Sequence, residues 1–310
     1  MTRVFIDGSQ GTTGLKIFDR LKKRNDIELV TLSEELRKDT QARKNAICTA
    51  DIAFLCLPDN AAVEAVELAG DCDTVIIDTS TAHRTSDGWC YGFPEVFGDG
   101  FQAVSSSKSI ASPGCYASGF IALVKPLIDN GIISSDCKLY CHALSGYSGA
   151  GKKGIALYES EEKPAELNSP REYALTQEHK HLKEMQKISG LALAPMFSPY
   201  ICDYYSGMLV TVPIFASELK NGNTVEDIKK LYRSIYNSPI VSYKETIDDN
   251  GFVASNAKSG LDSMDITVAG NSDRILLMAL YDNLGKGASG AALECMNVVM
   301  GLPCEYGLDL

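Results

Sequence analysis

Cys115 is the residue of this sequence most clearly placed for nucleophilic chemistry. It follows a Pro-Gly turn in "SIASPGCYASG" (residues 109–119), and apolar residues recur after it at helical spacing. Asn130-Gly131 would end such a helix, and Pro126 would kink it. A cysteine at a helix N-terminus meets the helix dipole and free N–H groups, which stabilise a thiolate and a developing oxyanion. The residues that predict a buried face of this helix are Phe120, Leu123, Val124, Leu127 and Ile128.

The other interpretation of Cys115 is that it packs as a small apolar side chain, as free cysteines commonly do. The chain has ten cysteines, several of them inside apolar runs, such as Cys56 in "IAFLCL". They are scattered, form no C-x-x-C pair and show no zinc-type spacing with the four histidines. This pattern predicts a cytoplasmic protein with reduced thiols and no metal site.

A thiolate nucleophile needs a partner that moves protons, and the four histidines are the first candidates. His83 follows "DTSTA", and His142 lies in a strand-like run. His179 and His181 form the pair in "EHKHLKEM". On a helix, two residues at this spacing diverge, so the pair does not favour a metal site. Each histidine could equally be a solvated side chain without a catalytic role, so the residues alone leave the partner open.

A glycine-rich loop, "GSQGTTG", follows the first strand-like run and begins a helical stretch. Glycine lets the backbone turn sharply and approach a pyrophosphate, and the helix N-terminus offers it N–H groups. The spacing differs from the commoner G-x-G-x-x-G, and a tight turn would also need glycines. The expected cofactor contacts are Gly8, Ser9, Gly11, Thr12, Thr13 and Gly14, with Pro58 and Ser80 after the third and fourth strand-like runs.

The segment after the second strand-like run bears on the choice of cofactor. In "SEELRKD", Ser33, Arg37 and Lys38 would accommodate a 2′-phosphate, whereas Glu34 and Glu35 would favour NAD. We favour NADP. A second glycine cluster, "SGYSGAGKKG", follows another strand-like run and is either a flexible turn or a loop that grips an anion with its amides, hydroxyls and lysines.

The order of elements predicts an α/β protein in two parts. Strand-like runs at 3–6, 27–32, 51–57 and 74–80 alternate with helical stretches, which indicates a parallel sheet covered on both faces. Asn60 is the expected N-cap of the helix at 60–70. Further strands are expected at 138–144, 208–215, 240–245, 265–270 and 274–283, with a helix at 224–237, which favours a mixed or antiparallel sheet. A last helix, within 287–302, would return to the first domain.

The composition is that of a globular protein, with 45% hydrophobic and 22% charged residues. A net charge of −11 argues against nucleic acid or an anionic membrane as the main partner. No apolar run reaches membrane-spanning length. An anionic small molecule remains a possible substrate, because local donors can oppose the overall charge.

Taken together, these motifs resemble those of the N-acetyl-γ-glutamyl-phosphate reductases, in the shorter of that family's two forms. The matching segments are "GSQGTTG", "DTSTAHR", "SPGCYASG", "SGYSGAG", "EHKHLKE" and "NLGKGASGAALECMN", in order along essentially the whole chain. The resemblance implies a Rossmann domain over 1–114, completed by the C-terminal helix of 287–310. It also implies an α+β catalytic and oligomerisation domain over 115–286, of the glyceraldehyde-3-phosphate and aspartate-semialdehyde dehydrogenase type. Such a domain implies a dimer or tetramer.

The resemblance also implies a mechanism, in arginine biosynthesis. Cys115 would attack N-acetyl-γ-glutamyl phosphate to give a thioester, which NADPH would reduce to N-acetylglutamate 5-semialdehyde, with His179 as acid–base and His181 and Glu184 beside it. Asn283, Lys286 and Gly287 would approach the nicotinamide. The implied substrate contacts are Ser112, Tyr116, Ser145, Gly146, Tyr147, Ser148, Gly149 and Arg171.

The sequence departs from the family at three positions. Ser118 stands where threonine is common, Ser112 where asparagine is frequent, and Lys183 where the histidine motif usually has proline. Two other functions stay open: a sibling enzyme that reduces aspartyl or aminoadipyl phosphate, and a dinucleotide-binding regulator without catalysis.

Overall fold

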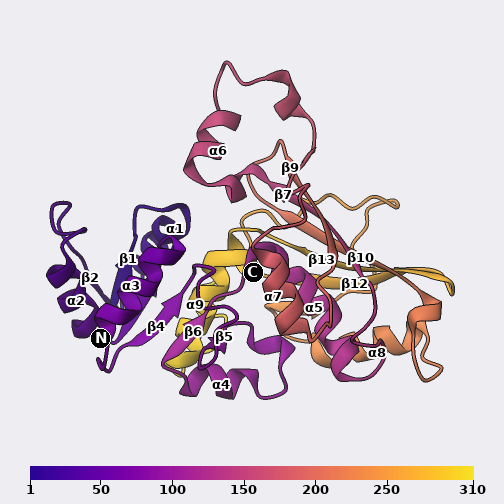
Figure 1. The fold of residues 1–310 in the computed structure, drawn as a ribbon, viewed down its shortest axis with the longest axis horizontal. Coiled ribbons are helices and arrows are strands. Elements are labelled where there is room, and N and C mark those ends of the chain that lie inside the picture. Colours follow the sequence, from indigo (N-terminus) through magenta and orange to yellow (C-terminus); the bar gives the residue numbers. More distant parts are fainter. The chain divides into compact units, whose positions relative to one another are not determined.

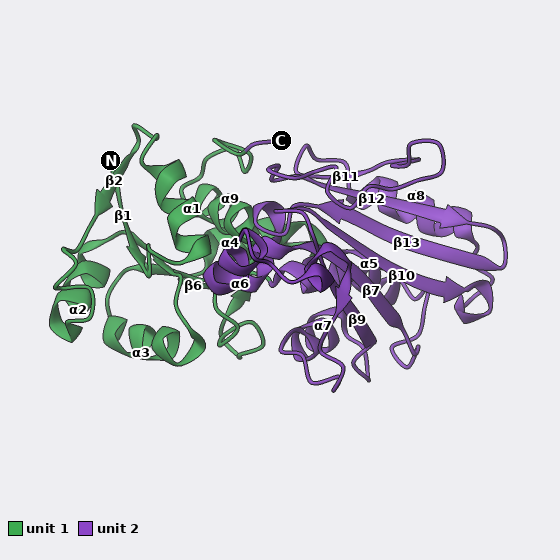
Figure 2. Ribbon diagram, turned by 90° about the horizontal axis from the view of Figure 1, so that it is seen from above, with its two compact units in different colours: residues 1–113, 288–308 green, residues 114–287, 309–310 purple.

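The computed structural model describes residues 1–310 and divides them into two compact units. Unit 1 comprises residues 1–113 and 288–308, and unit 2 comprises residues 114–287 and 309–310 (Figure 2). Each unit has its own β-sheet. None of the helices is both long and apolar enough to cross a membrane.

Unit 1 is built on six parallel strands in the order β2-β1-β3-β4-β6-β5. This confirms the parallel sheet predicted from the continuous apolar runs. The chain leaves β1 for β2 on one side and later adds β3 on the other, so the strand order reverses beside β1. Sheets of this kind bind nucleotides at the carboxyl ends of the strands at that point. The strands are β1 (Thr2–Asp7), β2 (Ile27–Val30), β3 (Ile52–Leu55), β4 (Val75–Asp78), β5 (Cys90–Tyr91) and β6 (Ser109–Ala111).

Helices cover both faces of this sheet (Figure 1). One hydrophobic cluster joins the sheet to α1 (Thr12–Leu21), α4 (Gly100–Ser106) and α9 (Gly290–Val299) through residues such as Ile17, Val104 and Met296. A second cluster joins the opposite face to α2 (Thr40–Thr49) and α3 (Asp59–Ala69) through Ile47 and Ala65. A short 3-10 helix, η1 (Pro94–Val96), precedes α4.

The structure corrects two expectations for unit 1. α3 begins at Asp59 with Pro58 in the N-cap position, so the predicted Asn60 cap is wrong; the ring of Pro58 presets an extended backbone before the first turn. Cys48 and Cys72 form a disulfide, so the cysteines are not all reduced thiols as predicted. α2 was not predicted, because its sequence is mostly polar; the Asp39 carboxylate caps it by accepting the Ala42 N–H at 2.7 Å.

Unit 2 contains a seven-stranded mixed sheet in the order β11-β12-β13-β10-β7-β9-β8. The pairs β11/β12 and β7/β9 are parallel and the others are antiparallel, which confirms the predicted mixed sheet. The strands are β7 (Tyr140–Gly146), β8 (Arg171–Glu172), β9 (Met196–Cys202), β10 (Met208–Phe215), β11 (Val241–Tyr243), β12 (Met264–Gly270) and β13 (Arg274–Tyr281).

The helix α5 (Cys115–Asp129) packs against β10 and β13 on one face of this sheet, with α7 (His181–Ser189) and α8 (Val225–Ile235) beside it. Consequently almost every residue from Tyr116 to Leu127 is buried; the predicted buried face is confirmed at Phe120, Leu123, Val124 and Leu127, and burial extends around the helix. In Figure 1, α6 (Gly151–Tyr158) lies in an excursion that leaves the sheet. The short helical turns are η2 (Tyr147–Ala150), η3 (Ala165–Asn168), η4 (Ala216–Glu218) and the π-helix η5 (Gly285–Ser289).

Candidate active site

The glycine loop of unit 1 forms a cradle in which side chains do not fit. Gly8 has φ +84°, and a Cβ there would lie 2.3 Å from the carbonyl oxygen of Cys56. A Cβ on Gly14 would lie 2.4 Å from the carbonyl oxygen of Gly8. α1 starts directly behind the loop, with Thr12 and Thr13 in its first turn. The loop therefore brings bare backbone to a helix N-terminus at the carboxyl end of β1, as a bound pyrophosphate requires.

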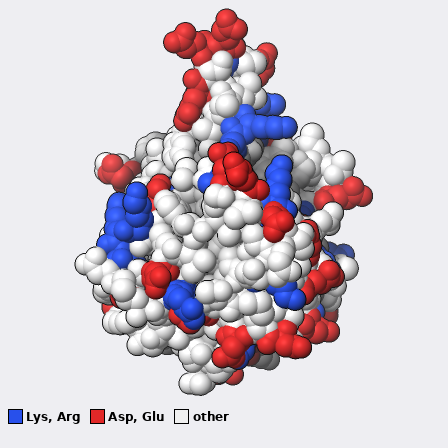
Figure 3. Space-filling view, turned by 90° about the vertical axis from the view of Figure 1, so that its left-hand side faces the viewer, with Lys and Arg blue, Asp and Glu red and all other residues white.

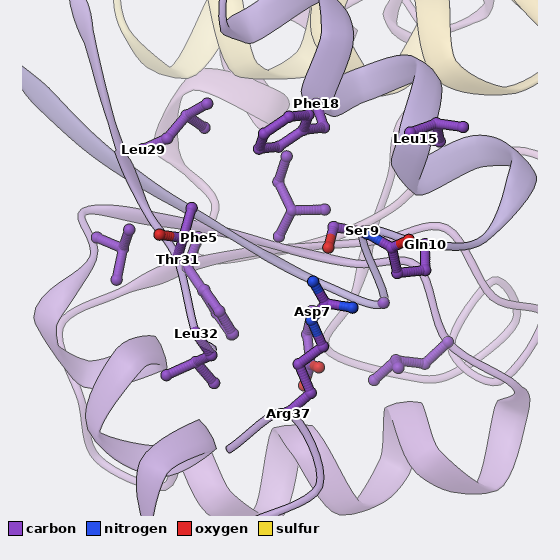
Figure 4. Close-up of a pocket in the computed structure, with 14 residues that line it drawn as sticks. Phe5, Asp7, Ser9, Gln10, Leu15, Phe18, Leu29, Thr31, Leu32 and Arg37 are labelled. Carbon is purple, nitrogen blue, oxygen red and sulfur yellow. The ribbon is translucent and has the colours of Figure 1, made fainter. Parts of the chain in front are cut away.

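A cavity of about 450 Å³ opens beside this loop (Figure 4). Gly8 and Ser9 border it, and Arg37 points into it from the segment after β2. Ser33, Lys38 and the two competing glutamates are not among its lining residues. Asp7 is the one carboxylate in the lining, and it is engaged by the Arg43 guanidinium at 3.0 Å. Burial raises the pKa of Asp7, with Arg43 opposing that rise. The free charge at this cavity is therefore positive.

Pro58 and Ser80 follow β3 and β4 as expected, but the Ser80 hydroxyl is already hydrogen-bonded within the protein. Its hydroxyl donates to Asp78 Oδ2 at 2.7 Å, and the same carboxylate oxygen lies 2.7 Å from His83 Nδ1. The ring of Trp89 stacks on His83 with centroids 4.0 Å apart. This buried network is the environment of the motif "DTSTAHR", and it places His83 in a structural role.

Ser112 ends the segment of unit 1 that leads to Cys115. Its N–H donates to the Asp78 carbonyl at 2.7 Å, and its own carbonyl accepts from Arg84 Nε at 2.9 Å. Its hydroxyl is buried and has no hydrogen-bond partner in the structure. Since buried hydroxyls are nearly always paired, this donor is consistent with the substrate contact predicted for Ser112.

Cys115 is the first residue of α5 in unit 2, as the sequence predicts, and it is half-buried. The N–H of the preceding Gly114 donates to Glu184 Oε1 at 2.8 Å. Gly287 lies against the nucleophile, because a Cβ at that position would be 3.1 Å from the Cβ of Cys115. Glu184 is 2% exposed, so a buried carboxylate from α7 holds the N–H of the residue before the thiol.

His179 and His181 lie together, contrary to the expectation that the two positions diverge. His179 precedes α7 and His181 is its first residue, so the pair is not on a continuous helix, and the ring centroids are 4.8 Å apart. Both rings lie against Tyr116, the residue after Cys115, at 6.1 and 5.9 Å between centroids. The histidine pair and the start of α5 therefore form one cluster.

The hydrogen bonding of His179 indicates its protonation state. The N–H of His181 donates to His179 Nδ1 at 3.2 Å, so we assign the ring proton to Nε2. Burial, and secondarily the charge of Lys180, lower the pKa of His179 to about 4. At neutral pH His179 is therefore an uncharged ring that presents an Nε2–H donor.

The second glycine cluster is ordered structure rather than the predicted loop. β7 continues through Ser145 and Gly146, and Tyr147 to Gly149 lie in η2, because β7 pairs with β9 as far as Cys202. Asn283 Nδ2 donates to the hydroxyl of buried Ser148 at 3.0 Å. Lys152 and Lys153 are exposed on α6, and the Arg171 side chain is exposed on β8. These three cations are therefore not placed in the cluster around Cys115.

Comparisons with known proteins match the two units of the chain to two different domains. Residues 3–103 match the family described as semialdehyde dehydrogenase, NAD binding domain, and residues 115–283 match semialdehyde dehydrogenase, dimerisation domain. A relative from Nostoc sp. named N-acetyl-gamma-glutamyl-phosphate reductase 2 is 42% identical and covers 99% of both chains. This chain belongs to the N-acetyl-γ-glutamyl-phosphate reductase family. Another reductase of that name, from Allorhizobium ampelinum, is 40% identical over 96% of this chain and 98% of its own.

The fold of this reductase is shared with aspartate semialdehyde dehydrogenases at low sequence identity. The enzyme II of Vibrio cholerae, solved in complex with ASA, matches with a TM-score of 0.71 and 16% identity over 97% of this chain and 98% of its own. The Candida albicans enzyme, solved with NADP, matches with a TM-score of 0.68 and 16% identity over the same shares. The predicted family and fold class are confirmed.

Three further residues of the reductase support the site without having been predicted, and all belong to unit 2. Tyr281 donates to the Cys115 carbonyl at 2.5 Å. Asp282 is fully buried and accepts hydrogen bonds from Ser206 and from the N–H groups of 260, 284 and 285. Tyr173 packs between Tyr116 and His179. The run "YDN" that ends at Asn283 was the available signal, because it interrupts an apolar strand with three polar groups.

Proposed function

We propose that this chain reduces N-acetyl-γ-glutamyl phosphate with NADPH to N-acetylglutamate 5-semialdehyde and phosphate, in arginine biosynthesis. The observation that carries the proposal is Cys115 at the start of α5, with its preceding amide held by buried Glu184. Relatives about 40% identical over nearly the whole chain carry the reductase name. Unit 1 would bind the cofactor and unit 2 would hold the reacting acyl group.

Cys115 would act as the nucleophile. Its thiolate attacks the γ-carbonyl carbon; a C–S bond forms, the C–O bond to phosphate breaks, and phosphate leaves with the electron pair. The product is a thioester on Cys115. When bound in unit 1, NADPH supplies the hydride that reduces such a thioester. The C–S bond then breaks, which releases the aldehyde and restores the thiolate.

His179 would support both steps as a hydrogen-bond donor. Negative charge develops on the carbonyl oxygen during thiolate attack and again during reduction, and an N–H directed at that oxygen stabilises it. The neutral ring with its proton on Nε2 suits this role. Because the alkoxide collapses by expelling the thiolate, the reduction needs no proton from the enzyme. We therefore propose that His179 donates a hydrogen bond, whereas the sequence led us to expect proton transfer.

The substrate is tested by the reverse, phosphate-dependent reaction. With N-acetylglutamate semialdehyde, NADP and phosphate, the wild type should reduce NADP far faster than with aspartate semialdehyde, and not at all without phosphate. A preference for aspartate semialdehyde would instead identify the sibling enzyme that shares this fold. NADP binding without turnover of any semialdehyde would identify a non-catalytic regulator.

NADP is the proposed cofactor, because Arg37 points into the cavity and the carboxylate there is neutralised by Arg43. Arg37→Ala should lower the ratio of kcat/KM for NADP over NAD by roughly tenfold or more, since a charge-assisted hydrogen bond contributes about 1.5–3 kcal/mol. Lys44→Ala, which removes an exposed cation of α2, is the matched control and should leave the ratio unchanged. An unaltered ratio in Arg37→Ala would show that another residue reads the 2′-phosphate.

A homodimer through the open face of the unit 2 sheet is proposed as the assembly. The face opposite α5 exposes apolar side chains at Tyr140, Met196, Phe215 and Leu276, which pairing register places on one side. This sheet lies in the segment that matches a dimerisation domain. Light scattering should give twice the 33.5 kDa of one chain, and Leu276→Glu should lower it toward one chain. A wild-type mass of one chain would refute the dimer.

Nucleic acid and membranes are not proposed as partners. On the face drawn in Figure 3, acidic and basic side chains are intermingled and no large basic patch is present. The cytoplasmic location expected from the scattered cysteines stays a prediction, which the Cys48–Cys72 disulfide does not support.

A further inference from the structure

Three buried tyrosines of unit 2 donate hydrogen bonds to carbonyl groups of α5, the helix that begins with Cys115. Tyr236 donates to the carbonyl of Ala122 at 2.5 Å, and Tyr232 donates to that of Leu123. Tyr281 donates to the carbonyl of Cys115 at 2.5 Å. In a regular helix each of these carbonyls accepts the N–H four residues later, so an extra donor needs an explanation.

Pro126 explains the bond from Tyr236. It stands four residues after Ala122 inside the helix and has no N–H, so the Ala122 carbonyl lacks its helical donor. The Tyr236 hydroxyl replaces that donor. Leu123 lies in the same disturbed turn, where Tyr232 acts. These two bonds therefore supply hydrogen-bond donors to carbonyl groups in the turn that Pro126 disturbs.

The bond from Tyr281 has no such explanation. The residue four positions after Cys115 is Gly119, which has an N–H of its own. That N–H donates to the Tyr281 hydroxyl at 3.0 Å, while the same hydroxyl donates to the Cys115 carbonyl. The Tyr281 hydroxyl thus bridges the N–H and the carbonyl group at the two ends of the first turn of α5, directly at the nucleophile. The preceding bond, from Ser118 N–H to the Gly114 carbonyl, is regular at 2.9 Å.

Gly119 leaves the space that the Tyr281 hydroxyl occupies at the first turn of α5. A Cβ at this position would lie 2.7 Å from the Tyr281 hydroxyl oxygen and 2.8 Å from Val210 Cγ2. Burial, with the neighbouring Cys115 as the next cause, holds the pKa of Tyr281 well above its usual range. The hydroxyl therefore keeps its proton and remains a donor to the Cys115 carbonyl.

We infer that Tyr281 is a positioning residue for Cys115, because its hydroxyl bridges the first turn of α5 and so fixes where the thiol stands. The inference rests on the proposed role of Cys115 as nucleophile. Glu184 holds the N–H of Gly114, the residue before Cys115, and Tyr281 holds the carbonyl of Cys115 itself, so the backbone is held on both sides of the thiol. Without the hydroxyl, the Cys115 carbonyl loses this donor and the Gly119 N–H loses this acceptor, so Tyr281 no longer holds the peptide group that follows Cys115.

The test measures Cys115 directly as well as turnover. In Tyr281→Phe, kcat should fall about tenfold or more with little change in the KM for NADPH, because small misplacements of a reacting group have large effects on rate. The pH at which alkylation of Cys115 by iodoacetamide is half-maximal, followed on its peptide by mass spectrometry, should rise toward that of an ordinary thiol. Other titratable groups facing this turn are Glu184, Cys141, Tyr116, Tyr173, His179 and His181, and all are unchanged in the variant.

Tyr236→Phe is the matched control, because it removes an equivalent buried hydroxyl from the same helix. Tyr236→Phe should lower the free energy of unfolding about as much as Tyr281→Phe does, but it should leave the pH profile of Cys115 alkylation and kcat unchanged. Gly119→Ala should reproduce the effect of Tyr281→Phe by crowding the hydroxyl, and the double variant should be less impaired than the two single effects combined. Gly119→Ala also carries the test if Tyr281→Phe does not fold.

The inference is overturned if Tyr281→Phe has the wild-type alkylation profile and kcat, or if Tyr236→Phe changes them equally. Cys115→Ser separates this failure from that of the proposed function. If Cys115→Ser is inactive while Tyr281→Phe behaves as wild type, only the positioning role is wrong. If Cys115→Ser keeps its turnover, the proposed nucleophile itself is wrong.

Discussion

At the scale of single residues, Cys115 differs from the other cysteines by its backbone environment. The half-buried thiol of Cys56 lies near the carboxylates of Asp7 and Asp78, and loss of solvation raises its pKa to about 12, so it stays protonated. Cys115 instead stands at the first turn of α5, beside a peptide group held by Glu184. A thiol at a helix start is the form that ionises readily, whereas one buried within the sheet is inert.

His179 gives a prediction about pH. Its pKa in the folded protein is about 4, below the ordinary value near 6.5, so the unfolded chain binds a proton that the folded protein rejects. The contribution of His179 to stability is therefore fully present above pH 6.5 and is lost as pH falls toward 4. NMR titration of the imidazole resonances should show His179 uncharged at pH 5.5, and His179→Gln should weaken the dependence of unfolding free energy on pH in that window.

A midpoint for His179 near 6.5 would contradict this assignment. Such a value would make His179 an acid–base group at neutral pH rather than a neutral donor. Exposed His142 of β7 offers an internal reference in the same spectra.

The location of Cys115 could be predicted because its signal is local: a Pro-Gly turn followed by helical spacing. Its partners could not be predicted from the same local signal, since Glu184 is 69 residues away and Tyr281 is 166 residues away in the chain; Glu184 was expected only through the family resemblance. The pairing of His179 with His181 was missed because the helix begins at His181, so the helical divergence assumed for the pair does not apply.

At the scale of elements, α5 shows how one proline is accommodated inside a buried helix. Tyr236→Phe should destabilise the protein by about 1–3 kcal/mol, because it leaves the buried Ala122 carbonyl without a donor. Pro126→Ala restores the N–H that this carbonyl lacks. The loss caused by Tyr236→Phe should therefore shrink in the Pro126→Ala background, as measured by urea unfolding of the four variants in a double-mutant cycle. Equal losses of unfolding free energy in both backgrounds would show that the Tyr236 hydroxyl does not replace the missing donor.

The helices and strands that were predicted well have either a clear periodicity of apolar residues or a continuous apolar run. β10 spans the predicted residues 208–215, and β2, β3 and β4 fall inside the predicted runs, whereas the short strands β5 and β6 were not predicted. α2 was missed because its sequence carries few apolar residues, and the second glycine cluster was misread because strand pairing with β9 overrides its glycine content. Local sequence carries propensity, whereas pairing depends on segments far along the chain.

At the scale of the whole molecule, two units divide the work. Unit 1 offers a glycine cradle and a positively charged cavity, which suit a phosphorylated dinucleotide. Unit 2 holds the thiol, the histidine pair and the buried tyrosines around one helix start. The reduction of an acyl phosphate needs both, because a thioester must form before a hydride can reduce the acyl group.

The central claim is that Cys115 forms the thioester, and one measurement tests it most directly. Phosphate-dependent reduction of NADP with N-acetylglutamate semialdehyde should fall at least about a thousandfold in Cys115→Ser, a loss expected for removing a nucleophile. Binding of NADP and the unfolding transition should stay those of the wild type, since the serine keeps the start of α5. Turnover by Cys115→Ser at the wild-type rate would contradict the account.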